Sequence, residues 1–131
     1  MSYLLDTNVC IALLKKGDQA LSARLRREAP TNVALCSVVR AELLYGARKS
    51  ERVDENLRLL EVFFAAFASL PFDDRAAEHY GAIRALLTRA GTPIGANDLL
   101  IASIALASDA TLVTRNLDEF RRVPGLRVDS W

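Results

Sequence analysis

The sequence has 131 residues, of which 51% are hydrophobic and 25% charged, and its formal net charge is +1 at pH 7. This length and apolar content predict a single domain with its own core, spanning residues 1–131. Because the two signs of charge nearly cancel, overall charge favours neither a polyanion-binding protein nor a partner of acidic proteins. Both cysteines lie in apolar stretches without an export signal, so we expect reduced thiols and a cytoplasmic protein with no membrane partner.

In chain order, apolar runs of strand length alternate with segments of helical periodicity. The expected strands or extended pieces cover residues 3–5, 32–37, 69–72, 110–114 and 126–130. The expected helices cover residues 8–17, 18–29, 38–50, 51–68, 73–91, 96–109 and 116–120, with Ser37 as a candidate cap. Strands separated by helices predict an α/β fold, with a central parallel sheet covered on both faces.

Asp6 ends the first predicted strand, in the sequence "LLDTNV". In parallel α/β sheets, functional groups collect outside the carboxyl ends of the strands, near the point where the strand order reverses. Asp6 is therefore a candidate site residue. Capping of the following helix explains an Asp at this junction equally well.

Two further acids stand at unusual positions. Glu42 falls on an apolar arc of its predicted helix, where an unpaired carboxylate is costly and needs a counter-charge, either a nearby Arg or Lys or a metal ion. Asp98 begins a helix that is apolar on almost every face, and helix capping again explains it as well. If Asp6, Glu42 and Asp98 converge, their mutual repulsion requires a cation, and all-oxygen ligation favours Mg²⁺ or Mn²⁺ over zinc.

The segment "TRNLDEF" follows the fourth predicted strand. Thr114, Asn116 and Asp118 could add a hydroxyl, an amide and a carboxylate to the same rim. Asn116 and Glu119 also have the spacing of a capping box, which explains both without any site. The sequence does not favour a histidine-based catalytic triad or a two-histidine zinc site, because His79 is the only histidine. It also has neither a phosphate-binding P-loop nor a dinucleotide fingerprint.

The ordered segments "LLDTNV", "SVVRAELLYGARKS", "TPIGANDLLIASIAL" and "LVTRNLDEF" resemble the PIN-domain ribonucleases of the VapC type, which are toxins of type II toxin-antitoxin pairs. The resemblance covers essentially the whole chain. It implies a three-layer α/β/α domain in which Asp6, Glu42 and Asp98 match the catalytic acids, with Asp6 and Asp98 holding Mg²⁺ or Mn²⁺. Asn116 stands where many relatives carry another Asp, and Asp118 is near enough in sequence to replace it in part.

The resemblance also implies a function and partners. We expect RNA cleavage by a water attacking a phosphate polarised by the cation, with Thr7, Asn8, Thr114 and Asn116 positioning ligands and water. Glu42 would bind a metal or act as general base. Residues 92–95 and 122–131 resemble the subgroup that cuts the anticodon loop of initiator tRNA, so we expect a tRNA substrate, a VapB-type antitoxin and a homodimer.

Two other functions remain open from the sequence. One is a catalytically silent PIN-like module that binds nucleic acid or protein, although such a module has no need for three mutually repelling acids. The other is a different Mg²⁺-dependent phosphoryl-transfer enzyme, such as a DNA nuclease or a phosphatase. An Asp-based phosphatase would usually carry a second Asp two residues after the first, where this chain has Asn8.

Overall fold

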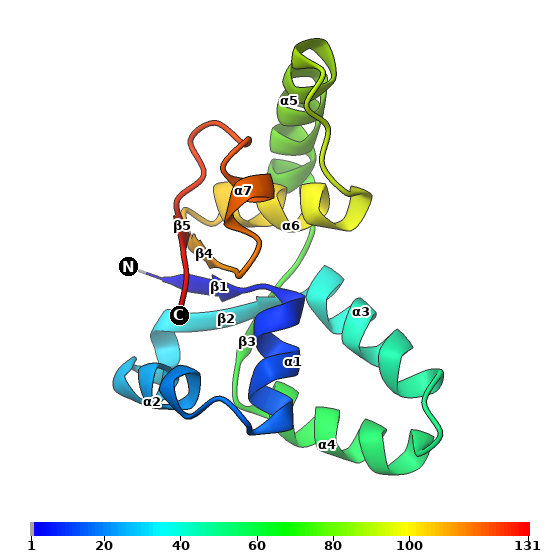
Figure 1. The fold of residues 1–131 in the computed structure, drawn as a ribbon. Helices are drawn as coiled ribbons and strands as arrows, with labels where there is room; N and C mark the ends of the chain where they lie inside the picture. The colour runs from blue at the N-terminus through cyan, green and yellow to red at the C-terminus, as the bar shows by residue number, and fades with distance from the viewer. Residues whose placement is uncertain (1) are drawn as a thin grey trace.

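A five-stranded parallel sheet forms the centre of the computed structural model, which describes residues 2–131 (Figure 1). Its strand order is β3-β2-β1-β4-β5, and every neighbouring pair is parallel. The strands are β1 (Tyr3–Leu5), β2 (Val33–Cys36), β3 (Ala68–Leu70), β4 (Thr111–Val113) and β5 (Val128–Asp129). The predicted α/β class with a central parallel sheet is confirmed.

The strand order reverses between β1 and β4. The chain adds β2 and then β3 on one side of β1, and it returns to add β4 and β5 on the other side. The crevice for a site therefore opens at the carboxyl ends of β1 and β4, which is where ligands bind in open α/β sheets.

Helices make up most of the connections between the strands. They are α1 (Thr7–Lys15), α2 (Gln19–Arg27), α3 (Ser37–Arg48), α4 (Val53–Ala65), α5 (Asp74–Ala90), α6 (Ala96–Ala107) and α7 (Leu117–Phe120). A short 3-10 turn over Pro30–Asn32 leads into β2. Helix α5 projects furthest from the sheet and leads through a short loop to the start of α6 (Figure 1).

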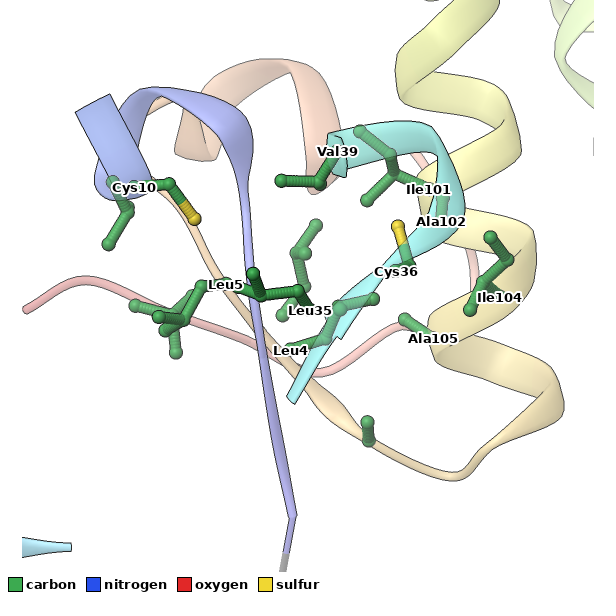
Figure 2. Packing of buried hydrophobic residues seen from close by; sticks show 14 of the residues in the cluster. Leu4, Leu5, Cys10, Leu35, Cys36, Val39, Ile101, Ala102, Ile104 and Ala105 are labelled. Atoms are coloured by element: carbon green, nitrogen blue, oxygen red, sulfur yellow. The ribbon is translucent and has the colours of Figure 1, made fainter. Parts of the chain in front are cut away.

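Helix α6 supplies a large part of the core, as its apolar sequence predicts. Ile101, Ala102, Ile104 and Ala105 are fully buried, and they lie near the side chains from β1 and β2 (Figure 2). Burial of this much apolar surface is the main stabilising term of such a domain. The core therefore fixes the start of α6, and with it Asp98, relative to the sheet.

Both cysteines, Cys10 and Cys36, are buried free thiols in this core, as expected. Burial raises the pKa of Cys36 to about 11, so this thiol stays protonated and unreactive at neutral pH. Among the residues that the structure describes, no helix is long and apolar enough to cross a membrane.

The ends of three predicted helices differ from the structure. Ser37 is the first residue of α3 and not its cap, because Cys36 at the strand end occupies the cap position with extended backbone and no capping side-chain hydrogen bond. Helix α1 ends at Lys15, two residues before Gly17, since Lys16 itself adopts the left-handed conformation (φ 56°). Helix α4 begins only at Val53, after a break that the sequence pattern did not indicate.

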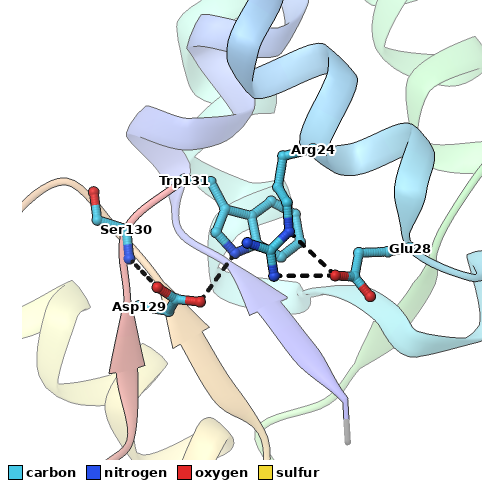
Figure 3. A network of polar contacts seen from close by, with 5 residues as sticks. All are labelled: Arg24, Glu28, Asp129, Ser130 and Trp131. Atoms are coloured by element: carbon cyan, nitrogen blue, oxygen red, sulfur yellow. Dashed lines mark hydrogen bonds and ion pairs between the residues drawn. The ribbon is translucent and has the colours of Figure 1, made fainter.

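The C-terminus is held against α2 by aromatic and polar contacts. The Arg24 guanidinium lies 4.8 Å from the ring centroid of Trp131, and Trp131 also makes an edge-on contact with Tyr3 at 5.0 Å. Asp129 accepts a hydrogen bond from the Trp131 indole, while Arg24 is paired with Glu28 (Figure 3). These contacts compensate for the short ladder of β5, which has two residues.

Candidate active site

Asp6 lies at the carboxyl end of β1, at the crevice between β1 and β4, and is only 4% exposed. Its Oδ1 accepts a hydrogen bond from the Thr7 backbone N–H at 2.8 Å, so it does cap α1. Its Oδ2 accepts the Thr114 hydroxyl at 2.7 Å, across 108 positions of sequence. Capping therefore uses one oxygen, and the second is held by the neighbouring strand end, which a helix cap does not require.

Burial raises the pKa of the Asp6 carboxyl, and the hydrogen bonds from Thr114 and Thr7 partly oppose this effect. The nearby charge of Glu119 raises it further. An ionised Asp6 is therefore costly by itself, and a nearby positive charge would stabilise it.

Glu42 is half-buried on α3 and is tied to the same place through Thr7. The Thr7 hydroxyl donates to Glu42 Oε1 at 2.9 Å. Asp6 therefore contacts the end of β4, and the next residue, Thr7, contacts α3. The ion pair considered from sequence is not formed: across residues 2–131, no Arg or Lys makes a salt bridge to Glu42.

Asp98 is the third residue of α6, and its carboxylate does not cap this helix. Gly95 occupies the N-cap position, and its backbone N–H donates instead to Glu119 Oε1 of α7 at 2.7 Å. Gly95 also leaves room there, because a Cβ at this position would lie 3.3 Å from Asp98 Oδ2 and 3.5 Å from Glu119 Oε1. The two carboxylates therefore meet beside the start of α6.

Burial and the adjacent charge of Glu119 raise the pKa of Asp98 to about 7. The charges of Asp6 and Glu42 contribute in the same direction, so Asp98 is affected by all three of the other acids. The pKa of Glu119 is lowered, chiefly by the hydrogen bond from the Gly95 backbone. The proton shared within this pair therefore belongs to Asp98.

Glu119 is the site residue that the sequence reasoning missed. Its spacing from Asn116 predicts a capping box, but the Asn116 side chain makes no capping bond and donates to Glu119 instead. The Asn116 backbone N–H donates to Thr114 Oγ1 at 3.0 Å, which orders the turn that carries Glu119 to the group.

The other predicted residues divide into two groups. Thr7 and Thr114 are buried and contact the acids directly, and Asn116 reaches them through Glu119. Asp118 is exposed on α7, and Asn8 is exposed on the first turn of α1. Within the described part of the chain, no hydrogen bond or ion pair joins either residue to the acids.

The chemistry of the donor atoms fits a hard divalent cation, but their spacing limits how many of them can bind it directly. The donors are all carboxylate and hydroxyl oxygens, and their mutual repulsion would be relieved by a positive ion. Yet no three acidic, histidine or cysteine side chains among residues 2–131 lie close enough together to enclose a metal. Mg²⁺ fits this arrangement, because it is commonly held by one or two carboxylates and keeps several waters.

Comparison with known proteins agrees with the fold. The sequence profile of the PIN domain matches residues 3–126. Ribonuclease VapC2 of Rickettsia felis is 40% identical over 132 residues, which cover 100% of this chain and 98% of the relative. The tRNA(fMet)-specific endonuclease VapC of Salmonella typhimurium is 38% identical, again over 100% of this chain and 98% of the relative.

Solved structures give the same result. A crystal structure of VapBC2 from Rickettsia felis, bound to a DNA fragment from its promoter, contains a chain that matches with a TM-score of 0.94 at 39% identity, covering 100% of this chain and 99% of that chain. DNA-bound VapBC from Salmonella typhimurium matches with a TM-score of 0.95 at 38% identity, covering 100% and 98%. The chain belongs to the PIN-domain family, whose nucleases are metal-dependent, and within it to the VapC ribonucleases of toxin-antitoxin systems.

Proposed function

We propose that this VapC ribonuclease is a Mg²⁺-dependent toxin that cuts tRNA, with Asp6 and Asp98 as the metal-holding residues. The observation that carries the proposal is the convergence of acids beside the start of α6: Asp98 and Glu119 meet at Gly95, and their proximity and burial raise the pKa of Asp98 to about 7. Such a group is costly to maintain in a folded protein unless a cation or a reacting group uses it. A divalent cation bound there would polarise the scissile phosphate and neutralise the charge that develops on it.

The remaining residues orient the reacting groups. Among residues 2–131 no Arg or Lys pairs with Glu42, and the Thr7 hydroxyl holds its Oε1. Its other oxygen is the group that would orient the attacking water and accept its proton. The Thr114 hydroxyl fixes the rotamer of Asp6. Glu119, held in place by Asn116 and the Gly95 backbone, keeps the proton of the acid pair on Asp98, and a bound cation would favour the ionised form of Asp98.

Basic residues beside these acids are suited to hold the RNA backbone. Arg121 and Arg122 are exposed and lie two and three residues after Glu119 in the chain, and Arg122 also donates to the Pro93 carbonyl at 3.0 Å. Phosphate contacts of this kind position a nucleic acid without reading its sequence. A single-stranded loop suits the site, because its phosphates and unstacked bases are accessible to protein side chains.

The proposed substrate and partners are based on the names and solved structures of the relatives. The name of the Salmonella typhimurium protein specifies tRNA(fMet), and we propose initiator tRNA, cut in its anticodon loop, as the substrate of this chain. The related crystal structures hold VapBC pairs, so a VapB-type antitoxin is the proposed partner. A homodimer and a cytoplasmic location complete the proposal.

The test is cleavage of total bacterial tRNA by the purified protein, freed of any partner, with Mg²⁺. Discrete fragments should appear, and they should vanish with EDTA or in Asp6→Ala, since both remove the proposed metal site. Sequencing the fragment ends identifies the RNA and the cut. Circular dichroism of Asp6→Ala is needed alongside, because Asp6 also caps α1 and a misfolded variant would mimic a catalytic loss.

Two results would contradict the proposal. Cleavage that persists in EDTA, or equally in folded Asp6→Ala, would remove the metal from the mechanism. Intact tRNA with Mg²⁺ and with Mn²⁺, for wild type and variant alike, would favour a protein that binds RNA without cutting it.

A further inference from the structure

Two hollows in the surface meet at Glu42. One, of about 400 Å³, lies between α1, α3 and α4, and its walls are mainly aliphatic, with Ile11, Leu14 and Leu59 among them. The other, of about 410 Å³, lies between α3 and the first turn of α6. Both hollows share Glu42 with the acid group, so each is placed to receive a nucleotide next to a phosphate bound at the acids.

The second hollow has the chemistry of a nucleotide site. Its lining residues include Tyr45, Asn97 and Ser37, which carry an aromatic ring, an amide and a hydroxyl. Aromatic faces stack on unpaired bases, and amides form hydrogen bonds with base edges. The aliphatic hollow has no aromatic ring among its lining residues, so it lacks the stacking surface that recognition of an unpaired base commonly uses.

Tyr45 is exposed to an extent that packing does not explain. Its side chain is 66% accessible, although the same helix buries Val39, Leu43 and Ala47. The Lys49 ammonium lies 5.1 Å from its ring centroid. An exposed aromatic ring with a cation beside it matches a base and its phosphate, which combine an apolar face with negative charge.

The position of Asn97 connects the hollow to the acids. Asn97 directly precedes Asp98 on α6, and Glu42 lies in the wall of the hollow on the α3 side. A base held by Asn97 and Tyr45 would therefore belong to a nucleotide beside the phosphate at Asp98 and Glu42. Both sides of the hollow stand on helices, which fixes their spacing.

We propose that the hollow formed by Ser37, Tyr45 and Asn97 binds one unpaired nucleobase of the RNA, next to the phosphate that is cut. Tyr45 stacks on the base, and the Asn97 amide reads its edge. This inference rests on the proposed function, because it places the base relative to the acids. It assigns substrate selection to residues outside the acid group.

The test uses an RNA hairpin with the anticodon loop of initiator tRNA, made intact and with each loop nucleotide abasic in turn. Tyr45→Ala should lower kcat/KM on the intact hairpin by about 10- to 100-fold, the effect of losing one stacked base, while Tyr45→Phe keeps the ring and most of the activity. Leu59→Ala, in the aliphatic hollow, is the matched control and should cut at the wild-type rate.

The decisive readout is coupling between protein and RNA. For wild type, one abasic position beside the cut should lower kcat/KM by a similar factor, and Tyr45→Ala should lose little more on that RNA. Asn97→Ala should reduce the difference in rate between the four bases at that position. If Tyr45→Ala and the abasic change are fully additive at every loop position, Tyr45 does not contact a base and the inference is wrong.

Two further measurements distinguish a wrong base site from a disrupted dimer and from a wrong proposed function. Light scattering of Tyr45→Ala checks the oligomeric state, and conversion of a dimer to a monomer, with equal losses on all hairpins, would make Tyr45 an interface residue and overturn the inference. Affinity for the hairpins is also measured with Ca²⁺ replacing Mg²⁺. If wild type cuts no RNA, the proposed function fails, and the base site then stands or falls on whether Tyr45→Ala removes the preference for intact over abasic hairpin.

Discussion

At the scale of single residues, Asp6 shows how a helix cap and a site residue can be the same side chain. One oxygen bonds to the first N–H of α1, and the other is held by Thr114 of the neighbouring strand end. Because each oxygen has a fixed partner, the carboxylate is ordered before any ligand arrives, which lowers the entropy cost of binding.

Thr114→Val tests that ordering. The change keeps the shape of a fully buried side chain but leaves Asp6 Oδ2 without its donor, so the pKa of Asp6 should rise further. We expect Mg²⁺ affinity, measured by calorimetry, to fall by about 10- to 100-fold, the usual effect of losing a group that orients a ligand. Thr114→Ser keeps the hydroxyl and should remain near wild type; equal losses in both variants would point to packing instead.

Asp98 gives a pH prediction. Because its pKa is about 7, a large fraction of the carboxyl is protonated at slightly acid pH and cannot hold a cation until the proton leaves. Apparent Mg²⁺ affinity should therefore rise as pH increases through neutrality. Isothermal titration at a series of pH values, with proton release read from buffers of different ionisation enthalpy, checks this. Affinity independent of pH across this range would contradict the raised pKa.

At the scale of elements, the C-terminal strand depends on side chains more than on its ladder. Strand β5 has two residues, and Trp131 beyond it lies against Arg24 (Figure 3). Trp131 also contacts the Tyr3 ring. Contacts between aromatic rings, and between a cation and a ring, each contribute on the order of 1 kcal/mol. The edge of the sheet therefore relies on one half-buried ring.

Trp131→Ala should lower the free energy of unfolding by roughly 1–3 kcal/mol, because it removes both ring contacts and the buried part of the indole. Urea denaturation followed by circular dichroism measures the change. Trp131→Phe keeps a ring for Tyr3 and Arg24 and should recover much of the loss. A stability of Trp131→Ala equal to wild type would show that β5 is held by its ladder alone.

At the scale of the whole molecule, the acid group opposes folding when no cation is bound. A carboxyl whose pKa is about 7 in the folded chain, against an ordinary value of 3.8, binds its proton more tightly when folded. Its contribution to stability is therefore greatest at low pH and is lost as pH rises toward and through 7. A bound cation would relieve the repulsion between the carboxylates and so raise the free energy of unfolding.

In EDTA, the Tm of wild type should fall between about pH 5 and about pH 8 by more than the Tm of Asp98→Asn, in which the titrating group is absent. At the upper pH the variant should be the more stable of the two. Thermal melts at matched salt check both statements. A parallel pH dependence in the two proteins would mean that Asp98 is not the group that titrates.

Added Mg²⁺ should reverse that loss. A cation at about 100 times its Kd stabilises the folded state by about 2.7 kcal/mol, which corresponds to a rise in Tm of several degrees for a domain of this size. The rise should be largest above neutral pH and absent in Asp6→Ala. An equal rise in that variant would indicate that Mg²⁺ binds elsewhere.

The sequence by itself determined the strand–helix alternation, the central buried helix α6 and the acids at strand and helix ends, because these follow from periodicity and local chemistry. Glu119 could not be found this way. Its spacing from Asn116 is that of a local capping box, and only the packing of α7 beside α6 turns its carboxylate to Gly95 and Asp98. The tertiary structure likewise decided that Thr114 holds Asp6 and that Asp118 stays outside, because contacts between residues distant in sequence depend on which strands become neighbours.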